Sequence, residues 1–254
     1  MDAQGDVVGE MPSGEQADAD PLAILFDVDG TLISTGGVGA RSWRWAFERL
    51  QGIPADIGEY SEAGMPDPVV ARRTFRSVTG REPTAREMAR ILAAYLERLP
   101  QEISASEHYR VLPGAQELLR RLCDGGYLLG LVTGALEAAA HIKLSRAGLN
   151  RFFSFGGYGS DSDDRTELTV RAIQRASTIL GLENVSARTY VVGDTPRDVQ
   201  AAHGAHAVAV GVASGRYSSE ELHAAGADIV MRSLEQPMPG VDRQRPIASH
   251  KPCE

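Results

Sequence analysis

Two carboxylates stand two residues apart in this chain, directly after an apolar run. Asp27 and Asp29 follow the segment Leu22–Phe26 and precede Gly30 and Thr31. One carboxylate of such a pair can attack phosphorus while the other moves protons. Their oxygens also suit a hard divalent cation such as Mg2+. An isolated Asp-x-Asp is usually a turn or a helix cap, but here it follows the pattern of a buried strand, which favours a catalytic role for the pair.

Three further polar clusters occupy corresponding places along the chain. Thr133 and Gly134 follow the apolar segment 127–132, Asp161 to Arg165 precede a helical pattern, and the segment Gly193–Asp198 follows the apolar segment 189–192. Ligands of open parallel sheets bind beyond the carboxyl ends of the strands. We therefore expect these clusters to meet Asp27 and Asp29 at one edge of a sheet.

The elements that position these clusters alternate between strand and helix. Such repeated units predict an α/β fold with a doubly wound, mainly parallel, Rossmann-like sheet. The segment 40–110 differs, because it contains helical patterns only, at 40–50, 67–77 and 84–99. The expected strands are 22–26, 127–132, 152–155, 189–192, 207–212 and 228–230, and the expected core helices are 113–123, 137–147, 167–180, 196–203 and 219–225.

These patterns divide the chain into a core, an insertion and two tails. We expect a catalytic core at 21–35 and 111–236, interrupted by a helical cap at 36–110. Residues 1–20 carry six acidic residues and no Lys or Arg, which predicts a disordered acidic tail. The proline-rich segment 237–254 predicts a flexible C-terminal tail.

Composition excludes several classes of protein. A net charge of -8 without a basic patch excludes nucleic acid as the main partner, and no apolar run is long enough to span a membrane. Two cysteines, Cys123 and Cys253, are too few for a disulfide framework. With no pattern of a secretory signal, we expect a cytoplasmic protein, either a monomer or a homodimer.

Together the motifs resemble the haloacid dehalogenase superfamily, in particular its phosphoglycolate phosphatase-like members with a helical cap. The first motif corresponds to Asp27–Thr31, the second to Thr133, and the fourth to the segment Gly193–Asp198. Each motif alone is a weak pattern, whereas three in family order, each at a strand end, are specific. The resemblance covers about residues 22–232.

The resemblance implies a role for each motif residue. Asp27 would be the nucleophile that forms an aspartyl-phosphate, and Asp29 the general acid and base. Mg2+ would bind the Asp27 and Asp194 carboxylates and the backbone carbonyl of Asp29. Thr133 would bind the phosphoryl group with Gly134 beside it, and Asp198 would orient neighbouring groups. The implied activity is hydrolysis of a small phosphate ester, such as phosphoglycolate or a sugar phosphate.

The third motif departs from the family pattern, which has a lysine. Arg165 is the best match, since its guanidinium carries the same charge and can bind phosphate in a bidentate manner. Arg171 and Lys143 are weaker candidates, and we expect Lys143 to lie on a solvated helix face. In the cap, Asp67 either faces the substrate or caps the helix that follows it.

Two other functions remain open at this stage. A sugar phosphomutase shares all these motifs, and a catalytically silent binding or regulatory domain could retain the scaffold. A dehalogenase is disfavoured, because the resemblance implies that dehalogenases lack an acid at the position of Asp29.

Overall fold

The computed structural model describes residues 21–53, 55 and 62–241. The predicted acidic tail and residues 242–254 of the predicted C-terminal tail lie outside the described residues. Residues 237–241 pack against the core, because Met238 is buried and the carbonyl of Val241 accepts a hydrogen bond from the Tyr127 hydroxyl.

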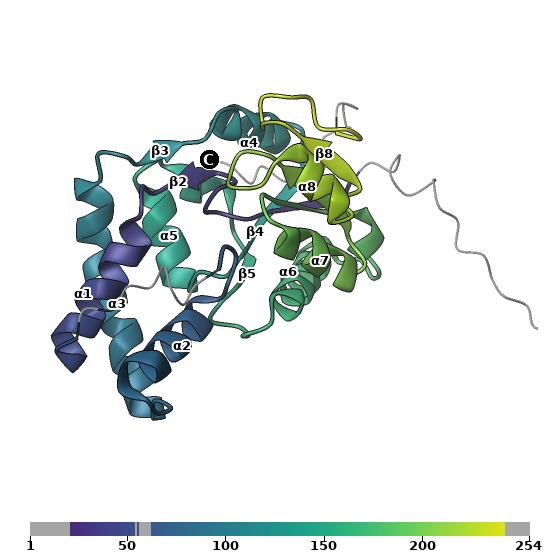
Figure 1. The fold of residues 1–254 in the computed structure, drawn as a ribbon. Helices are drawn as coiled ribbons and strands as arrows, with labels where there is room; N and C mark the ends of the chain where they lie inside the picture. The colour runs from purple at the N-terminus through teal and green to yellow at the C-terminus, as the bar shows by residue number, and fades with distance from the viewer. Residues whose placement is uncertain (1–20, 54, 56–61, 242–254) are drawn as a thin grey trace, which may run out of the picture.

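A six-stranded parallel sheet forms the centre of the molecule (Figure 1), in the order β5-β4-β1-β6-β7-β8. All five neighbouring pairs are parallel, which confirms the predicted fold class. The strands are β1 (Ala23–Phe26), β4 (Leu128–Thr133), β5 (Gly156–Tyr158), β6 (Thr189–Gly193), β7 (Val208–Val212) and β8 (Ile229–Met231).

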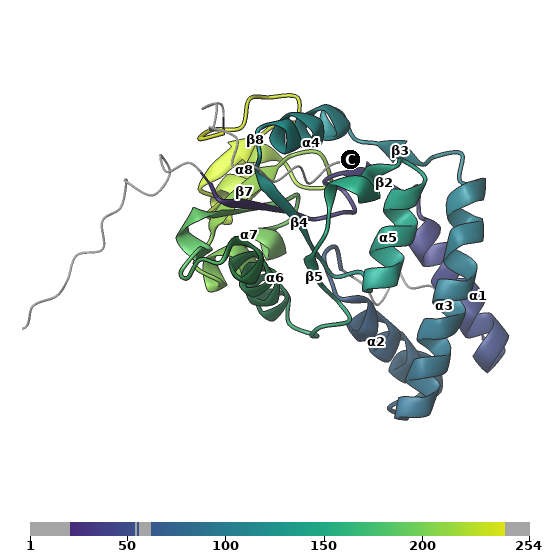
Figure 2. The same cartoon turned by 180° about the vertical axis from the view of Figure 1, so that it is seen from behind.

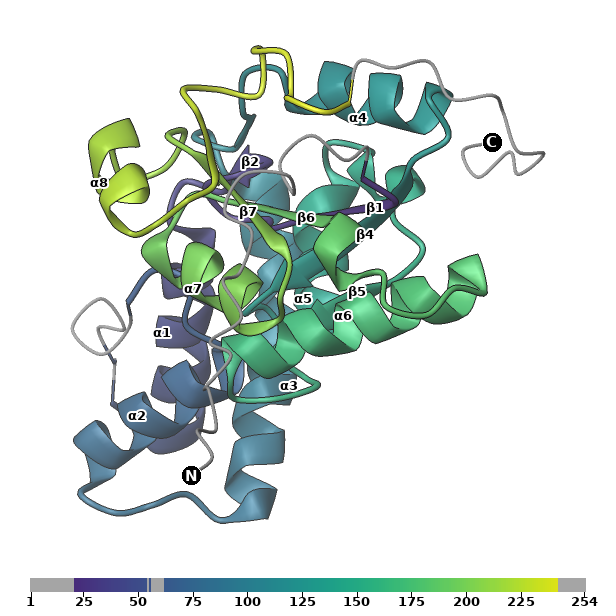
Figure 3. The same cartoon turned by 90° about the vertical axis from the view of Figure 1, so that its right-hand side faces the viewer.

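Helices cover both faces of this sheet (Figure 3). The alternation of β1 explains why, since Ile24 and Phe26 pack into one apolar cluster and Ala23 and Leu25 into another. The first cluster includes α4 (Ala115–Asp124) and α5 (Glu137–Ser145), and the second includes α6 (Arg165–Leu180) and α7 (Pro196–Gly204). The remaining core helices are α8 (Ser219–Ala224) and the short 3-10 helices η3 (Leu149–Phe152) and η4 (Ser186–Arg188).

The helical insertion leaves and re-enters the core through two short antiparallel strands that the sequence did not predict. Strand β2 (Ile33–Ser34) pairs with β3 (Arg110–Val111). Between them lie α1 (Val38–Gln51), α2 (Asp67–Thr79) and α3 (Ala85–Ala105), beside the sheet in Figures 1 and 2. We call this inserted helical segment the cap.

The interior of the cap is aromatic. The Trp43 and Tyr95 rings are stacked with their centroids 3.9 Å apart, which joins α1 to α3. Helix α3 begins with a capping box between Thr84 and Glu87. It continues through Pro100 to Ala105, past the predicted end at residue 99. Leu99 and Ile103 are buried on either side of the proline, and their packing outweighs the lost hydrogen bond.

One predicted strand lies elsewhere in the structure. The apolar residues of segment 152–155 suggested a strand, but Phe152 ends η3 and the strand is β5. Two glycines make β5 unrecognisable by composition. They are required by close packing, because a Cβ on Gly157 would lie 2.0 Å from the carbonyl oxygen of Leu168 in α6.

No described helix is long and apolar enough to cross a membrane. The thiol of Cys123 is not free. The cysteine content therefore does not by itself assign a cellular compartment.

Candidate active site

The residues singled out in the sequence meet at the carboxyl ends of the central strands. Asp27 follows β1, Thr133 ends β4, Asp194 follows β6 and Arg165 begins α6. All four are buried. The parallel register carries each polar cluster to the same edge of the sheet, as the sequence predicted.

Arg165 holds the acidic residues of the site together. Its Nη2 lies 2.8 Å from Oδ1 of Asp27, and Nε and Nη2 both donate to Oδ1 of Asp198, at 2.9 and 2.5 Å. Its Nη1 donates to the backbone carbonyl of Gly64 in the cap, at 2.9 Å. Burial opposes its charge, but Asp198 and Asp27 outweigh burial and raise the pKa of Arg165. The guanidinium therefore stays charged beside Asp27, where the third motif requires a cation.

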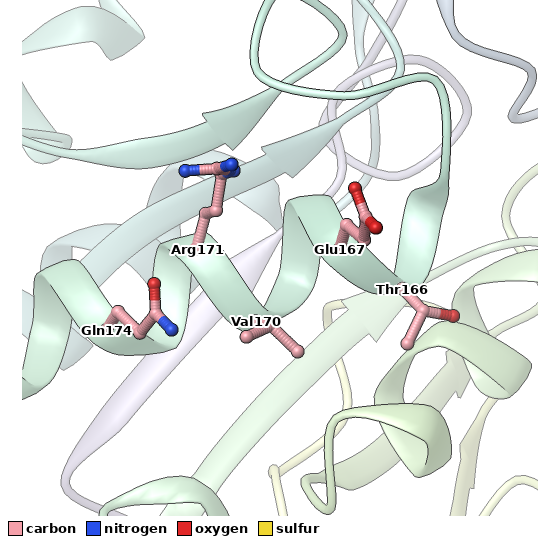
Figure 4. A pocket seen from close by; sticks show the side chains of 5 residues that line it. All are labelled: Thr166, Glu167, Val170, Arg171 and Gln174. Carbon is pink, nitrogen blue, oxygen red and sulfur yellow. The ribbon is translucent and has the colours of Figure 1, made fainter.

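The rival Arg171 lies elsewhere, on the exposed side of α6. It lines a shallow pocket with Thr166, Glu167, Val170 and Gln174 (Figure 4). None of the predicted site residues lines that pocket. The structure therefore favours Arg165 over Arg171 by position.

Three carboxylates lie close enough to share a cation. One oxygen each from Asp27, Asp194 and Asp198 lie within 4.8 Å of one another. Burial first, and then the charge of neighbouring acids, raises the pKa of Asp27 to about 7 and that of Asp194 to about 8, although Arg165 acts in the opposite direction on Asp27. Uncompensated negative charge on hard oxygen ligands is what Mg2+ would neutralise, so the residues fit this metal.

Asp198 is already engaged by protein donors. Its Oδ1 accepts from Arg165, and its Oδ2 accepts from the Thr195 backbone N–H at 3.0 Å and from the Thr195 hydroxyl at 2.7 Å. The carboxylate therefore orients Arg165 and caps α7. Asp27 and Asp194 are the carboxylates better placed to bind a metal directly.

The backbone of Asp29 is available for the same purpose. Its loop forms a bridge to Ile33 whose two hydrogen bonds use the carbonyl of Val28 and the N–H of Gly30. The carbonyl of Asp29 takes no part in that bridge. It can therefore serve as the third protein ligand that the resemblance implies.

The Asp194 carboxylate is wedged between two backbone segments that carry glycine. A Cβ on Gly30, whose φ is +91°, would lie 2.4 Å from Oδ2 of Asp194, and a Cβ on Gly215 would lie 1.7 Å from the same atom. Real Cβ atoms do not approach an oxygen this closely. Any side chain at these positions would displace the carboxylate, so the glycines fix its place.

Thr133 is the last residue of β4 and Gly134 follows it, with different surroundings. Thr133 lies two residues beyond Leu131, which pairs with Phe26 at the end of β1. Gly134 lies against the cap. Its carbonyl accepts from the N–H of Asp67 at 2.7 Å, and a Cβ there would meet the Met65 carbonyl oxygen at 2.7 Å.

Asp67 connects the cap to the core. Pro66 is the N-cap of α2, so Asp67 does not occupy the capping position. Its Oδ2 accepts from the backbone N–H of Leu136 at 2.9 Å, and its carboxyl also accepts from the Trp43 side chain. Burial raises the pKa of Asp67, and the charge of Lys143 opposes this. The carboxylate therefore holds the start of α2 against the N-terminus of α5.

The position of Lys143 differs from the one that the sequence predicted. It was expected on a solvated face of its helix, yet its side chain is only 7% exposed and its Nζ lies 2.5 Å from Oδ2 of Asp29. A signal was present, because Lys143 follows Ala139 by four residues and shares that buried face with Ala140. The expectation missed the docking of α3 on α5, which covers this face.

Comparisons with known proteins agree with this architecture. A family model described as haloacid dehalogenase-like hydrolase matches residues 21–206. The chain therefore belongs to the haloacid dehalogenase-like hydrolases, and the six-stranded sheet with its inserted helices is the fold expected of a capped member of that family.

The relatives of this chain within the family include phosphatases. The chain is 30% identical to phosphoglycolate phosphatase of Rhodospirillum rubrum, over 92% of this chain and 100% of the relative. It is 29% identical to the probable phosphatase IndB of Dickeya dadantii, over 84% of this chain and 90% of the relative. The crystal structure of a predicted phosphoglycolate phosphatase from Haemophilus somnus aligns with a TM-score of 0.67 at 21% identity, covering 85% of this chain and 96% of that one.

Proposed function

We propose that this protein is a Mg2+-dependent phosphatase that hydrolyses a small phosphorylated metabolite through an aspartyl-phosphate on Asp27. The observation that carries the proposal is the contact of Arg165 with Asp27, at 2.8 Å, beside Asp194 in a buried acidic cluster. The proposed nucleophile, cation and metal ligands would thus share one site at the strand ends.

In the first half-reaction, a carboxylate oxygen of Asp27 attacks phosphorus. The bond from phosphorus to the ester oxygen breaks, and Asp29 gives its proton to the departing alcohol. In the second half-reaction, water attacks the aspartyl-phosphate and gives a proton to Asp29. Phosphate then leaves, and the Asp27 carboxylate is restored.

The remaining residues hold the phosphoryl group and its charge. Thr133 donates a hydrogen bond to a phosphoryl oxygen, and Arg165 offers a cation where charge is redistributed in the transition state. Mg2+, bound by Asp27, Asp194 and the Asp29 carbonyl, would reduce the repulsion between the anionic nucleophile and the phosphate. The cap contacts core residues on either side of the site, through Gly64 and Asp67.

The substrate class is proposed from the relatives. The phosphoglycolate phosphatase of Rhodospirillum rubrum and the probable phosphatase IndB support a small phosphate monoester. We further propose a cytoplasmic enzyme that acts as a monomer or homodimer.

The test is phosphate release from a panel of small phosphate esters, with Mg2+ and with EDTA. We expect Mg2+-dependent turnover by the wild type and none by Asp27→Asn, with both proteins equally folded by circular dichroism. Full turnover by Asp27→Asn would refute the assignment of the nucleophile. Formation of an isomeric sugar phosphate without phosphate release would identify a phosphomutase, and no reaction with any ester would support a binding domain.

A further inference from the structure

Lysine is almost absent from this chain. Of its 26 Lys and Arg residues, only Lys143 and Lys251 are lysines. Lys143 is also buried, whereas lysine side chains are almost never fully buried unless they are paired. A buried ammonium group in an arginine-rich chain requires a specific partner, and the structure supplies one.

That partner is Asp29, the residue proposed as general acid and base. The Lys143 side chain is 7% exposed and that of Asp29 is 42% exposed, so the ammonium group lies beneath a carboxylate that faces outward. Nζ contacts Oδ2. Within the described part of the chain, Oδ1 of Asp29 accepts no hydrogen bond. The contact thus fixes one oxygen and leaves the other for the reaction.

The cap surrounds Lys143 on its other sides. Asp67 of α2 lies near enough for its charge and that of Lys143 to act on each other. Tyr109, at the re-entry from the cap, donates from its hydroxyl to the Lys143 carbonyl at 2.8 Å. Lys143 therefore lies between the catalytic loop after β1 and the cap.

We infer that Lys143 is a positioning residue for Asp29: its ammonium group holds Oδ2 so that Oδ1 exchanges the proton with the leaving alcohol and then with water. This inference rests on the proposed phosphatase function. Lys143 itself neither gains nor loses a proton in either half-reaction. Binding of an anionic group of the substrate by Lys143 is the competing role, but one cation facing both Asp29 and Asp67 carries no excess positive charge for an anion.

Leaving-group dependence tests the inference. Protonation matters most when the alcohol leaves poorly, so Lys143→Met should lower kcat/KM, which reports the steps up to release of the alcohol, roughly a hundred-fold on phenyl phosphate and less than about ten-fold on p-nitrophenyl phosphate. The matched control is Arg146→Met. Arg146 is a cation on the same end of α5 that also bonds the cap, through the carbonyls of Ile103 and Ser106, without touching Asp29. The decrease in kcat/KM that Arg146→Met causes should be the same for both substrates.

A second arm uses coupling between residues. In an Asp29→Asn background, Lys143→Met should lower kcat no further, because the positioned group is already gone. Equal losses on both substrates, or additive losses in the double variant, would overturn the inference. So would an unchanged kcat with a raised KM confined to esters whose alcohol carries a negative charge, since that pattern identifies substrate binding.

A third arm does not depend on activity. Selective isotopic labelling of lysine gives two side-chain signals by NMR, and Lys143→Met identifies one of them. Asp29→Asn should shift the Lys143 signal and leave the other in place, and an unmoved Lys143 signal would refute the contact. A wild type that hydrolyses no ester would refute the proposed function, whereas active wild type with equal losses would refute only the role of Lys143.

Discussion

Removal of one buried carboxylate should change how the stability of the metal-free protein depends on pH. Burial and neighbouring acids raise the pKa of Asp27 to about 7 and of Asp194 to about 8, from an ordinary value of 3.8. A carboxyl with a raised pKa in the folded state favours its protonated form there. The stability that the raised pKa gives the folded protein is fully present at a pH below the pKa of the unfolded state, and it is lost as pH rises through the pKa of the folded state.

The size of the effect follows from the difference between the two pKa values. For Asp194, a rise from 3.8 to about 8 corresponds to roughly four pH units at about 1.4 kcal/mol each. Between about pH 5 and about pH 8, ionisation of this group should therefore cost on the order of 4 kcal/mol. Because Asp27 and Asp194 repel each other, their two costs do not add.

The assay is urea denaturation in EDTA at several pH values. From about pH 5 to about pH 8, the free energy of unfolding should fall more steeply for the wild type than for Asp194→Asn, and the two should approach each other at acid pH. Added Mg2+ should make the pH dependence of the wild type shallower, since binding to the folded state adds about 2.7 kcal/mol at a hundred times Kd, and should change that of Asp194→Asn less. Asp124→Asn, at an exposed position of α4, is the control. Equal slopes for the wild type and Asp194→Asn would refute the reasoning.

Substitutions at three further residues have defined outcomes. Arg165→Met should lower kcat/KM for phosphate release by roughly a hundred- to a thousand-fold, and Arg165→Lys should recover part of that loss. Equal kcat/KM values for the wild type and Arg165→Met would contradict the proposed interaction of Arg165 with the phosphoryl group. Asp67→Ala should raise the rate of proteolysis within the cap, because the N–H of Leu136 loses its acceptor at a cost of about 1–3 kcal/mol; unchanged protection would show that other contacts hold the cap. Gly215→Ala should weaken Mg2+ binding by calorimetry, since its Cβ would lie 1.7 Å from the Asp194 carboxylate, and unaltered affinity would argue against that metal ligand.

The sequence predicted the elements whose signals are local. The apolar strands β1 and β6 each end directly before an acidic motif, so the strand ends and the chemistry could be located together. Arg165 could be placed in the polar cluster before the predicted helix 167–180, as the best match to the third motif, and the structure begins that helix earlier, at Arg165 with Asp164 as its N-cap. The order of the motifs then fixed the edge of the sheet at which they meet.

Features that depend on distant segments could not be predicted in the same way. The burial of Lys143 arises from α3, which packs on α5 from about 40 residues away. The sequence left two roles open for Asp67, a helix cap and a substrate contact. The structure shows a third, because the Asp67 carboxylate accepts a hydrogen bond from the N–H of Leu136 across the cap–core boundary. The glycines of β5 give no strand signal, and both are dictated by close packing, Gly157 against α6 and Gly156 against Tyr158 and Leu131.

The central claim is that Asp27 forms a covalent bond to phosphorus, and trapping that species tests it most directly. The protein is mixed with Mg2+ and p-nitrophenyl phosphate, quenched in acid within one turnover, and its peptides are analysed by mass spectrometry. We predict that the peptide containing Asp27 carries one phosphoryl group in the wild type and in a slowly hydrolysing Asp29→Asn variant, and none in Asp27→Asn. Phosphate release with no phosphorylated Asp27 at any time would contradict the account.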